Sequence, residues 1–265
     1  MIKALLSALL VGCFAASPQY ISTSGGGQPG YSAACTAPTM TYRYAAYNSS
    51  NACGTTGGSS CTTNGQAAYS AADFVAGNTA TEATTARQAV YNTNEINGLP
   101  AWTFSDAVAG TGFVMGTAIP SSISAFTMYA VMEFPTAHAG ALLSNTPGGA
   151  IEWRINSGNN MQLEVNETLN IGASTQNLST NTWYTVVVTY NTVSGAYAFY
   201  NASGGTLTAE GSGTNAQSFT QPTAIIGNAG FGTSDYYNGQ IAEIGFLNSV
   251  NTTGIAAWSK CEYGL

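Results

Sequence analysis

Short runs of apolar residues, each bounded by Gly, Asn, Pro or Ser, follow one another from residue 101 to residue 247. Short strands at regular spacing, with turn residues between them, are typical of an all-β sandwich or barrel. One later segment, residues 252–261, has the length and composition of a short helix. The predicted strands are residues 101–104, 112–115, 126–134, 141–144, 150–155, 161–165, 169–171, 183–190, 196–200, 206–209, 224–226 and 240–247.

Two of these strands have informative faces. Residues 183–190 carry apolar side chains at both alternating sets of positions, so we expect a central strand that is covered on both sides. In residues 240–247, Glu243 shares a face with apolar side chains, and its carboxylate therefore needs a hydrogen-bond partner there. The tryptophans are expected in the strand core, at Trp102, Trp153 and Trp183, and in the terminal helix that docks on it, at Trp258.

The sequence before residue 35 differs from the rest. An apolar run, residues 4–16, follows Lys3, and the segment after it is rich in Gly and Ser. The run is too short to span a membrane. It resembles a secretory signal, or a bacterial lipobox ending at Cys13, and it suits equally an uncleaved anchor packed inside an assembly. We therefore divide the chain into an N-terminal arm, residues 1–34, and a folded region, residues 35–265.

The first part of the folded region, residues 35–87, is rich in Ala, Thr, Asn and Gly, and no strand is predicted in it. Aromatic side chains punctuate this segment, at Tyr42, Tyr44, Tyr47, Tyr69 and Phe74.

The chain carries little charge. Charged residues make up 6% of it, with five Lys or Arg against twelve Asp or Glu, which gives a formal net charge of −7. Nucleic acids and anionic membranes both require clustered basic residues, so the composition excludes them as partners. Lys and Glu, the usual residues of helix surfaces, are scarce. The composition is typical of a β-rich protein that works outside the cytoplasm.

Four cysteines lie in the folded region. Cys53 and Cys61 flank a short Gly/Ser/Thr-rich loop, which a local disulfide would close. Cys35 and Cys261 lie near opposite ends of the region and would pair if the first and last elements of the sandwich are neighbours. The alternative is that all four are buried free thiols in a reducing compartment. The spacing contains no Cys-x-x-Cys or Cys/His cluster, so a zinc site is not expected.

Three segments resemble a laminin G-like domain of the concanavalin A-like lectin/glucanase superfamily, of the type found in bacteriophage virion and bacterial surface proteins. Residues 181–201 are similar to the family's Trp strand, turn and following strand. Residues 226–244 are similar to its closing strand, although Ala242 stands where Asp is common, and residues 96–104 are similar to its lead-in. The resemblance covers about residues 40–265. It implies a jelly roll of two packed antiparallel sheets with neighbouring ends, which suits a Cys35–Cys261 pair.

The superfamily includes glucanases, so catalysis has to be tested. Retaining glycoside hydrolysis needs two carboxylates about 5–5.5 Å apart, and an i, i+2 pair on one strand would supply them. The nearest candidate, Glu152, has Arg154 two residues later, and we interpret the two as an ion pair on one face. The one histidine, His138, is expected in an exposed loop. The sequence predicts no catalytic residue, unless carboxylates distant in sequence converge.

Sugar binding needs an aromatic platform with amide or carboxylate groups beside it. The loop at residues 230–238 offers this combination, while the resemblance assigns Tyr237 to the core. The alternative is that these are ordinary turn residues. The candidate carbohydrate-binding residues are Phe231, Asp235, Tyr236 and Asn238, with a second set, Asn156 and Asn159, in the turn after Trp153.

No cofactor is predicted apart from calcium. Asp235, with loop carbonyls, is the candidate Ca²⁺ ligand by analogy with some members of the family. The acidic cluster that calcium sites usually have is missing around it.

These observations predict an all-β jelly-roll sandwich of two antiparallel sheets, with an extended N-terminal arm and a short C-terminal helix. We expect a non-catalytic, surface-displayed glycan-binding or adhesion module, and specifically a bacteriophage decoration, fibre or tail protein. Its expected partners are cell-surface glycans and, through residues 1–34, other virion or surface subunits of an oligomer or assembly. The expected location is the virion surface or the cell surface. The alternatives are a purely structural virion subunit, a secreted or lipid-anchored bacterial surface protein, and a glycan-active enzyme.

Overall fold

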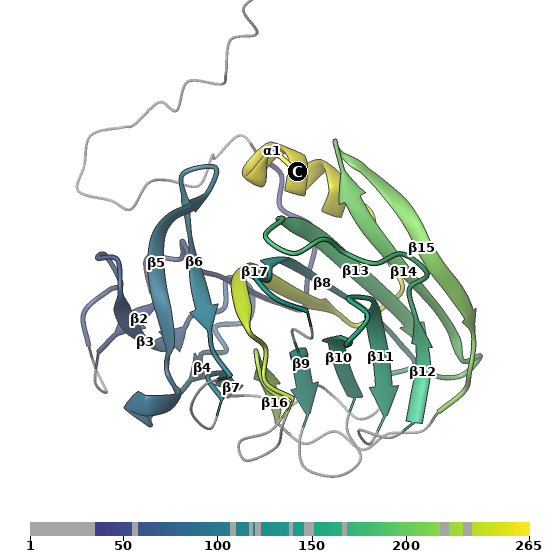
Figure 1. Cartoon of the computed structure of the whole chain (residues 1–265), viewed down its shortest axis with the longest axis horizontal. Coiled ribbons are helices and arrows are strands. Elements are labelled where there is room, and N and C mark those ends of the chain that lie inside the picture. Colours follow the sequence, from purple (N-terminus) through teal and green to yellow (C-terminus); the bar gives the residue numbers. More distant parts are fainter. Residues whose placement is uncertain are drawn as a thin grey trace, which may run out of the picture.

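The structure is a computed structural model that describes residues 35–54, 58–106, 110–116, 119, 123–137, 140–145, 151–165, 169–217, 223–229 and 235–265. The N-terminal arm, His138 and Phe231 lie outside the described residues. Within them the fold is a two-layered antiparallel β-structure with one α-helix near the C-terminus (Figure 1). No helix of the described part is long and apolar enough to cross a membrane.

One layer, sheet I, has β8 and β17 at its centre. Every neighbouring pair in it is antiparallel, and the edge of β17 that faces away from β8 is shared by β1 and β6. Its strands, in spatial order, are β15 (Thr206–Thr214), β14 (Ala196–Ser203), β13 (Tyr184–Asn191), β8 (Ala125–Glu133), β17 (Gly239–Leu247), and then β1 (Tyr42–Ala45) together with β6 (Leu99–Phe104).

The other layer, sheet II, packs against sheet I. It continues into sheet I at one side, because β5 pairs with both β3 and β6. A 3₁₀ turn, η1 (Thr85–Arg87), precedes β5. The strands of sheet II are β12 (Leu169–Ala173), β11 (Met161–Val165), β10 (Ile151–Ile155), β9 (Gly140–Asn145), β16 (Ala224–Ile226), β7 (Phe113–Met115), β4 (Ala80–Thr81) and β3 (Gln66–Ala71), with β2 (Ala52–Cys53) and β5 (Ala89–Ile96) beside β3.

The main core lies between the two sheets, where Met128 and Val188 of sheet I meet Trp153 and Leu163 of sheet II. The outer face of sheet I is also covered, because helix α1 (Ile255–Tyr263) lies on it. This explains why β8 and β13 are apolar on both faces, as the sequence predicts for residues 183–190. Trp258 docks α1 on the sheet as expected, and Trp102 and Trp153 are core residues. Trp183 does not join them, since it is only partly buried at the start of β13.

All twelve strands predicted between residues 101 and 247 are present within a few residues of their expected bounds, and the predicted helix is α1. The prediction was wrong for the first part of the chain. Residues 35–87 are not irregular throughout, because they contain β1 to β4 and η1, and β5 was also missed. These strands are short or poor in bulky apolar residues, so their pattern is weak. Strand pairing and the cysteines hold this segment in place.

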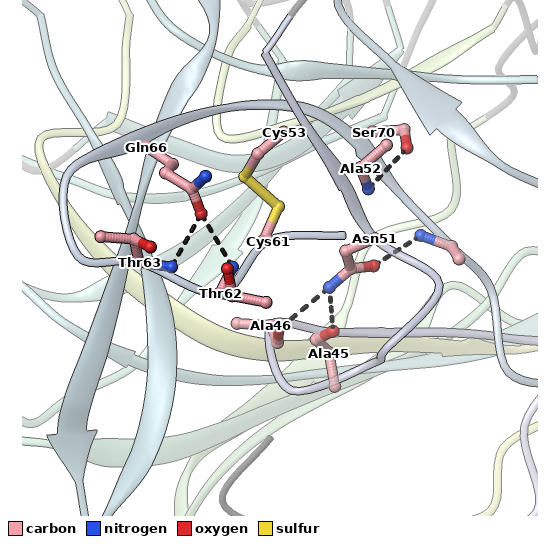
Figure 2. Close-up of a disulfide and its surroundings, with 11 residues drawn as sticks. Ala45, Ala46, Asn51, Ala52, Cys53, Cys61, Thr62, Thr63, Gln66 and Ser70 are labelled. Carbon is pink, nitrogen blue, oxygen red and sulfur yellow. Dashed lines mark hydrogen bonds between the residues drawn. A yellow bond between two sulfur atoms is a disulfide. The ribbon is translucent and has the colours of Figure 1, made fainter. Parts of the chain in front are cut away.

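Both expected disulfides are present. Cys35 is bonded to Cys261 of α1, and Cys53 to Cys61. Figure 2 shows the second bridge beside the side chain of Gln66, which accepts hydrogen bonds from the backbone N–H groups of Thr62 and Thr63, both at 2.8 Å. Covalent and side-chain contacts therefore fix residues 61–66, a segment that has little apolar surface of its own.

The carboxylate of Glu243, on β17, is fully buried and is surrounded by donors, which confirms that it finds hydrogen-bond partners on its apolar face. The guanidinium of Arg43 packs between the rings of Phe74 and Trp258, with its carbon 4.7 and 4.5 Å from their centroids. The donors to Glu243 are Arg43 Nε at 2.8 Å, Tyr47 Oη at 3.0 Å, Tyr263 Oη at 2.7 Å, Trp258 Nε1 at 3.2 Å and Tyr129 Oη.

Candidate functional site

The outer face of sheet II is polar, in contrast to the part of the outer face of sheet I that α1 covers. Trp153 and Leu163 point into the core, so the residues that alternate with them on β10 and β11 point outward. In the antiparallel register Glu152 is paired with Ser144 on one side and with Glu164 on the other. Side chains paired in this way lie about 4.5–5.5 Å apart at Cβ. Two carboxylates therefore face each other across neighbouring strands.

Arg154 lies at the centre of a charge cluster on this face. Its Nη1 is 3.4 Å from Glu152 Oε1 and 3.7 Å from Glu164 Oε2, and its Nη2 donates to Asp235 Oδ1 at 2.8 Å. The side chain of Glu152 is only 2% exposed, whereas that of Asp235 is 24% exposed. Burial alone would lower the pKa of Arg154, but the attraction of Glu152, Asp235 and Glu164 raises it above its ordinary value. The cluster is therefore a fixed cation with an excess of carboxylates around it.

The structure places one of the predicted site residues, Asp235, against this face, and Tyr236 follows it in the chain. Asp235 belongs to the Arg154 cluster, and the ring of Tyr236, next along the chain, lies over Gly110, where any Cβ would overlap it. Asn238 is half-buried, and Phe231 lies outside the described residues. Tyr237 is fully buried, as the resemblance implies, and its hydroxyl donates to the carbonyl of Glu133 at 2.8 Å.

The second predicted set, in the turn between β10 and β11, serves the turn itself. Asn156 Oδ1 accepts from the backbone N–H of Gly158 at 2.9 Å and of Asn160 at 3.1 Å. Asn159 has a left-handed backbone, with φ of 60°. Within the described part of the chain, no hydrogen bond joins this turn to the Arg154 cluster. These contacts agree with the alternative that Asn156 and Asn159 are ordinary turn residues. A sugar contact of either residue stays a prediction.

The interpretation of Glu152 and Arg154 as an ion pair on one face is confirmed. The run that contains Glu164 offers no i, i+2 pair, and the pairing of Glu164 with Glu152 was not predicted. A signal for it exists, because Glu152 and Glu164 are equally distant from Gly158 in the intervening turn, and a symmetric hairpin pairs such positions. The carboxylates converge through strand register instead of through an i, i+2 pair.

Calcium does not fit these groups well. The three carboxylates of the cluster surround a guanidinium, and Asp235 already accepts its hydrogen bond. Among the described residues there is no group of three or more His, Cys, Asp or Glu side chains suited to hold a metal ion. We derive no chemistry for this face through a metal.

Comparison with known proteins places the chain in a family. Residues 110–253 match the family model described as "Concanavalin A-like lectin/glucanases superfamily". The chain belongs to this superfamily. No curated protein sequence matches it significantly.

Several solved structures resemble this chain at low sequence identity. A GH54 α-L-arabinofuranosidase variant has a TM-score of 0.53 and 16% identity, over 83% of this chain and 59% of that one. Domain 4 of a GH43 extracellular arabinanase from Geobacillus stearothermophilus has a TM-score of 0.47 and 16% identity, over 65% and 80% of the two chains. A heptameric pentraxin from Limulus polyphemus has a TM-score of 0.42 and 17% identity, over 53% and 71%. At this level of identity the likeness concerns the fold alone.

Proposed function

We propose that this protein is a non-catalytic glycan-binding module that works outside the cytoplasm, and that it binds sugar on the outer face of sheet II. The observation that carries the proposal is the carboxylate of Asp235, which Arg154 holds in place, with the half-buried Tyr236 next to it in the chain. Membership of the lectin/glucanase superfamily and the two disulfides support it. Disulfides persist in oxidising compartments.

The chemistry of this face suits sugar hydroxyls. Carboxylate oxygens accept hydrogen bonds from hydroxyls, and an aromatic ring packs on the apolar side of a sugar. Asp235 is the most exposed carboxylate of the cluster, and its position is fixed by a charge-assisted hydrogen bond. Such fixing lowers the entropy that is lost on binding.

A hydrolase is the second candidate, because Glu152 and Glu164 face each other across two strands. Two features argue for binding without catalysis. Both carboxylates share the Nη1 of Arg154, and Glu152 is 2% exposed, whereas a general acid must reach the glycosidic oxygen. Release of reducing sugar from a polysaccharide panel, and its loss in Glu164→Gln, would establish the hydrolase instead.

The binding proposal is tested with the full-length protein on a glycan array, followed by affinity measurements on the best ligand. Asp235→Asn keeps the shape of the side chain but removes its charge, and we expect its affinity to fall about tenfold, since a hydrogen bond to a charged group contributes about 1.5–3 kcal/mol. Tyr236→Ala should cost a similar factor, and Tyr236→Phe, which keeps the ring, serves as its matched control. Binding to no glycan, or unchanged binding by folded Asp235→Asn, would overturn the site.

The more specific proposal is display on a bacteriophage virion or a bacterial surface, with residues 1–34 contacting neighbouring subunits of an assembly. Its support is the apolar N-terminal run and the low charge of the chain. Deletion of residues 1–30 should abolish incorporation into particles or envelopes while the remaining chain stays folded. Loss of incorporation from a protein that binds no glycan would favour the purely structural subunit.

A further inference from the structure

A second polar surface lies on the outer face of sheet I, beyond the part that α1 covers. Thr103 of β6 and Glu133 of β8 are both register partners of Gln240 on β17, which lies between them. The register between β8 and β13 pairs Met132 with Tyr184, so its next step brings Trp183 opposite Glu133. We call these four residues the Trp183 row, and all four are partly exposed.

Hydrogen bonds hold the side chains of Gln240 and Thr103 in place. Gln240 Nε2 donates to Thr103 Oγ1 and to Glu95 Oε2, both at 3.2 Å. Asn92 Nδ2 donates to the same Thr103 oxygen at 2.6 Å. These hydrogen-bonded side chains come from three adjacent strands, β5, β6 and β17, so their positions are set by the sheet. A ligand would meet an ordered surface with amide and carboxylate groups still partly open to solvent.

Among the residues that the structure describes, no cation pairs with the two carboxylates of this surface. Neither Glu95 nor Glu133 forms an ion pair within the described ranges, where Arg43 and Arg154 pair with carboxylates at other places. Burial, and then the nearby charge of Glu95, raise the pKa of Glu133. A ligand that brought a further negative charge would meet repulsion, whereas a hydroxyl would satisfy these acceptors.

Trp183 supplies an aromatic side chain at the end of the row. The other three tryptophans, Trp102, Trp153 and Trp258, are at most 1% exposed. Trp183 is partly exposed, and it packs on the apolar cluster beneath α1 that includes Val131 and Ala242. An anchored indole with part of its surface in solvent is a platform for the apolar side of a sugar ring.

We propose that the Trp183 row, with Glu95 and Asn92, is a second binding site, for an uncharged sugar residue of a glycan chain. The ring of the sugar packs on Trp183, and its hydroxyls donate to Glu133, to Glu95 and to the amide oxygen of Gln240. This site goes beyond the proposed function, because it lies on the other sheet and on the opposite face of the sandwich from Asp235.

Tryptophan fluorescence can report on this site selectively. Acrylamide should quench mainly Trp183, and Trp183→Phe should remove most of the quenchable signal. The probes are neutral hexasaccharides of glucose (β-1,4 and α-1,4), xylose, mannose and arabinose, with oligogalacturonate as the acidic comparison. We expect at least one neutral probe to lower the quenching constant of the full-length protein at least twofold, and oligogalacturonate to leave it unchanged.

Variants separate this site from the first one. In folded Asp235→Asn the protection of Trp183 should persist, and in Glu133→Gln and Gln240→Ala the probe concentration needed for half-protection should rise about tenfold. Thr206→Ala, exposed on β15, is the control with unchanged protection. The proposal is overturned if no neutral probe protects Trp183, if the acidic probe protects it equally, or if Glu133→Gln and Gln240→Ala have no effect. Failure of the proposed Asp235 site would be seen in a different experiment, because glycan-array binding would then be the same for Asp235→Asn and the unmodified protein.

Discussion

Arg43 on β1 donates its Nε–H to Glu243 on β17 at 2.8 Å, although 200 residues separate them in sequence. The pair lies beneath α1 and is enclosed by the hydroxyls of Tyr47, Tyr129 and Tyr263. Burial and the charge of Glu243 raise the pKa of Tyr129 and Tyr263 well above the ordinary value, so both stay protonated and donate. One carboxylate thus connects the first strand, the last strand and the helix.

Removing one partner of this pair should destabilise the fold strongly. Arg43→Met leaves a buried carboxylate without its cation, and such a loss typically costs about 3–5 kcal/mol. Urea unfolding followed by circular dichroism measures it. In the double variant Arg43→Met with Glu243→Met, we expect a cost well below the sum of the two single costs, because neither charge is left alone. Strictly additive costs would show that the two side chains act independently.

The two disulfides should contribute unequally. The Cys35–Cys261 bridge closes a loop with a sequence separation of 226, and the Cys53–Cys61 bridge one with a separation of 8. On the chain-entropy model these correspond to about 5 and about 2.5 kcal/mol. Thermal unfolding of Cys35→Ala with Cys261→Ala, and of Cys53→Ala with Cys61→Ala, compares them. A larger loss for the local bridge would contradict the prediction.

The ring of Tyr197 on β14 lies between two glycines, Gly172 on β12 and Gly213 on β15. A Cβ at Gly213 would come 2.7 Å from Tyr197 Cζ, and one at Gly172 would come 2.7 Å from Tyr197 Oη. Since the ring is confined on both sides, Gly213→Ala should destabilise by about 1–3 kcal/mol, as overpacking does. Tyr197→Leu should make Gly213→Ala less costly, and an unchanged cost in that background would refute the proposed clash.

The pKa of Glu133 provides a test in the folded state. Glu95→Gln removes the nearby charge but keeps an acceptor for Gln240, so the pKa of Glu133 should fall toward its ordinary value. Because the folded-state pKa is raised, protonated Glu133 favours folding below about pH 4.3, and this contribution is lost as the pH rises through the raised value. Carboxyl carbon NMR titration of Glu133 in both proteins measures the shift, and identical titration curves would contradict it.

Much of the fold was predictable because the central strands carry strong patterns. β13 and β8 are apolar on both faces, and turn residues mark their ends, so the period of the pattern alone locates them. β3 consists mainly of Ala, Ser, Gln and Tyr, and β2 and β4 have two residues each. Such segments become strands because they pair with neighbouring strands in the sheet, and the local sequence pattern does not indicate this pairing.

The candidate site was predictable only in part. Asp235 and Tyr236 stand out by residue type in a loop, and Arg154 by its spacing from Glu152. Asp235 bonds to Arg154 because a loop distant in sequence returns to β10. The spacing of residues along the sequence does not determine this return. Trp183 was assigned to the core because its strand is apolar, yet it stands one position before β13 and is only partly buried.

The bond between Cys35 and Cys261 has a mechanical consequence. When a molecule tethered at residues near 35 is pulled from residues near 261, the tension passes through the sulfur–sulfur link and bypasses the hydrogen-bonded strands. The sandwich would then keep both sheets intact under loads that would otherwise peel β1 or α1 away. Such resistance suits a protein that must stay attached while flow or motion strains it.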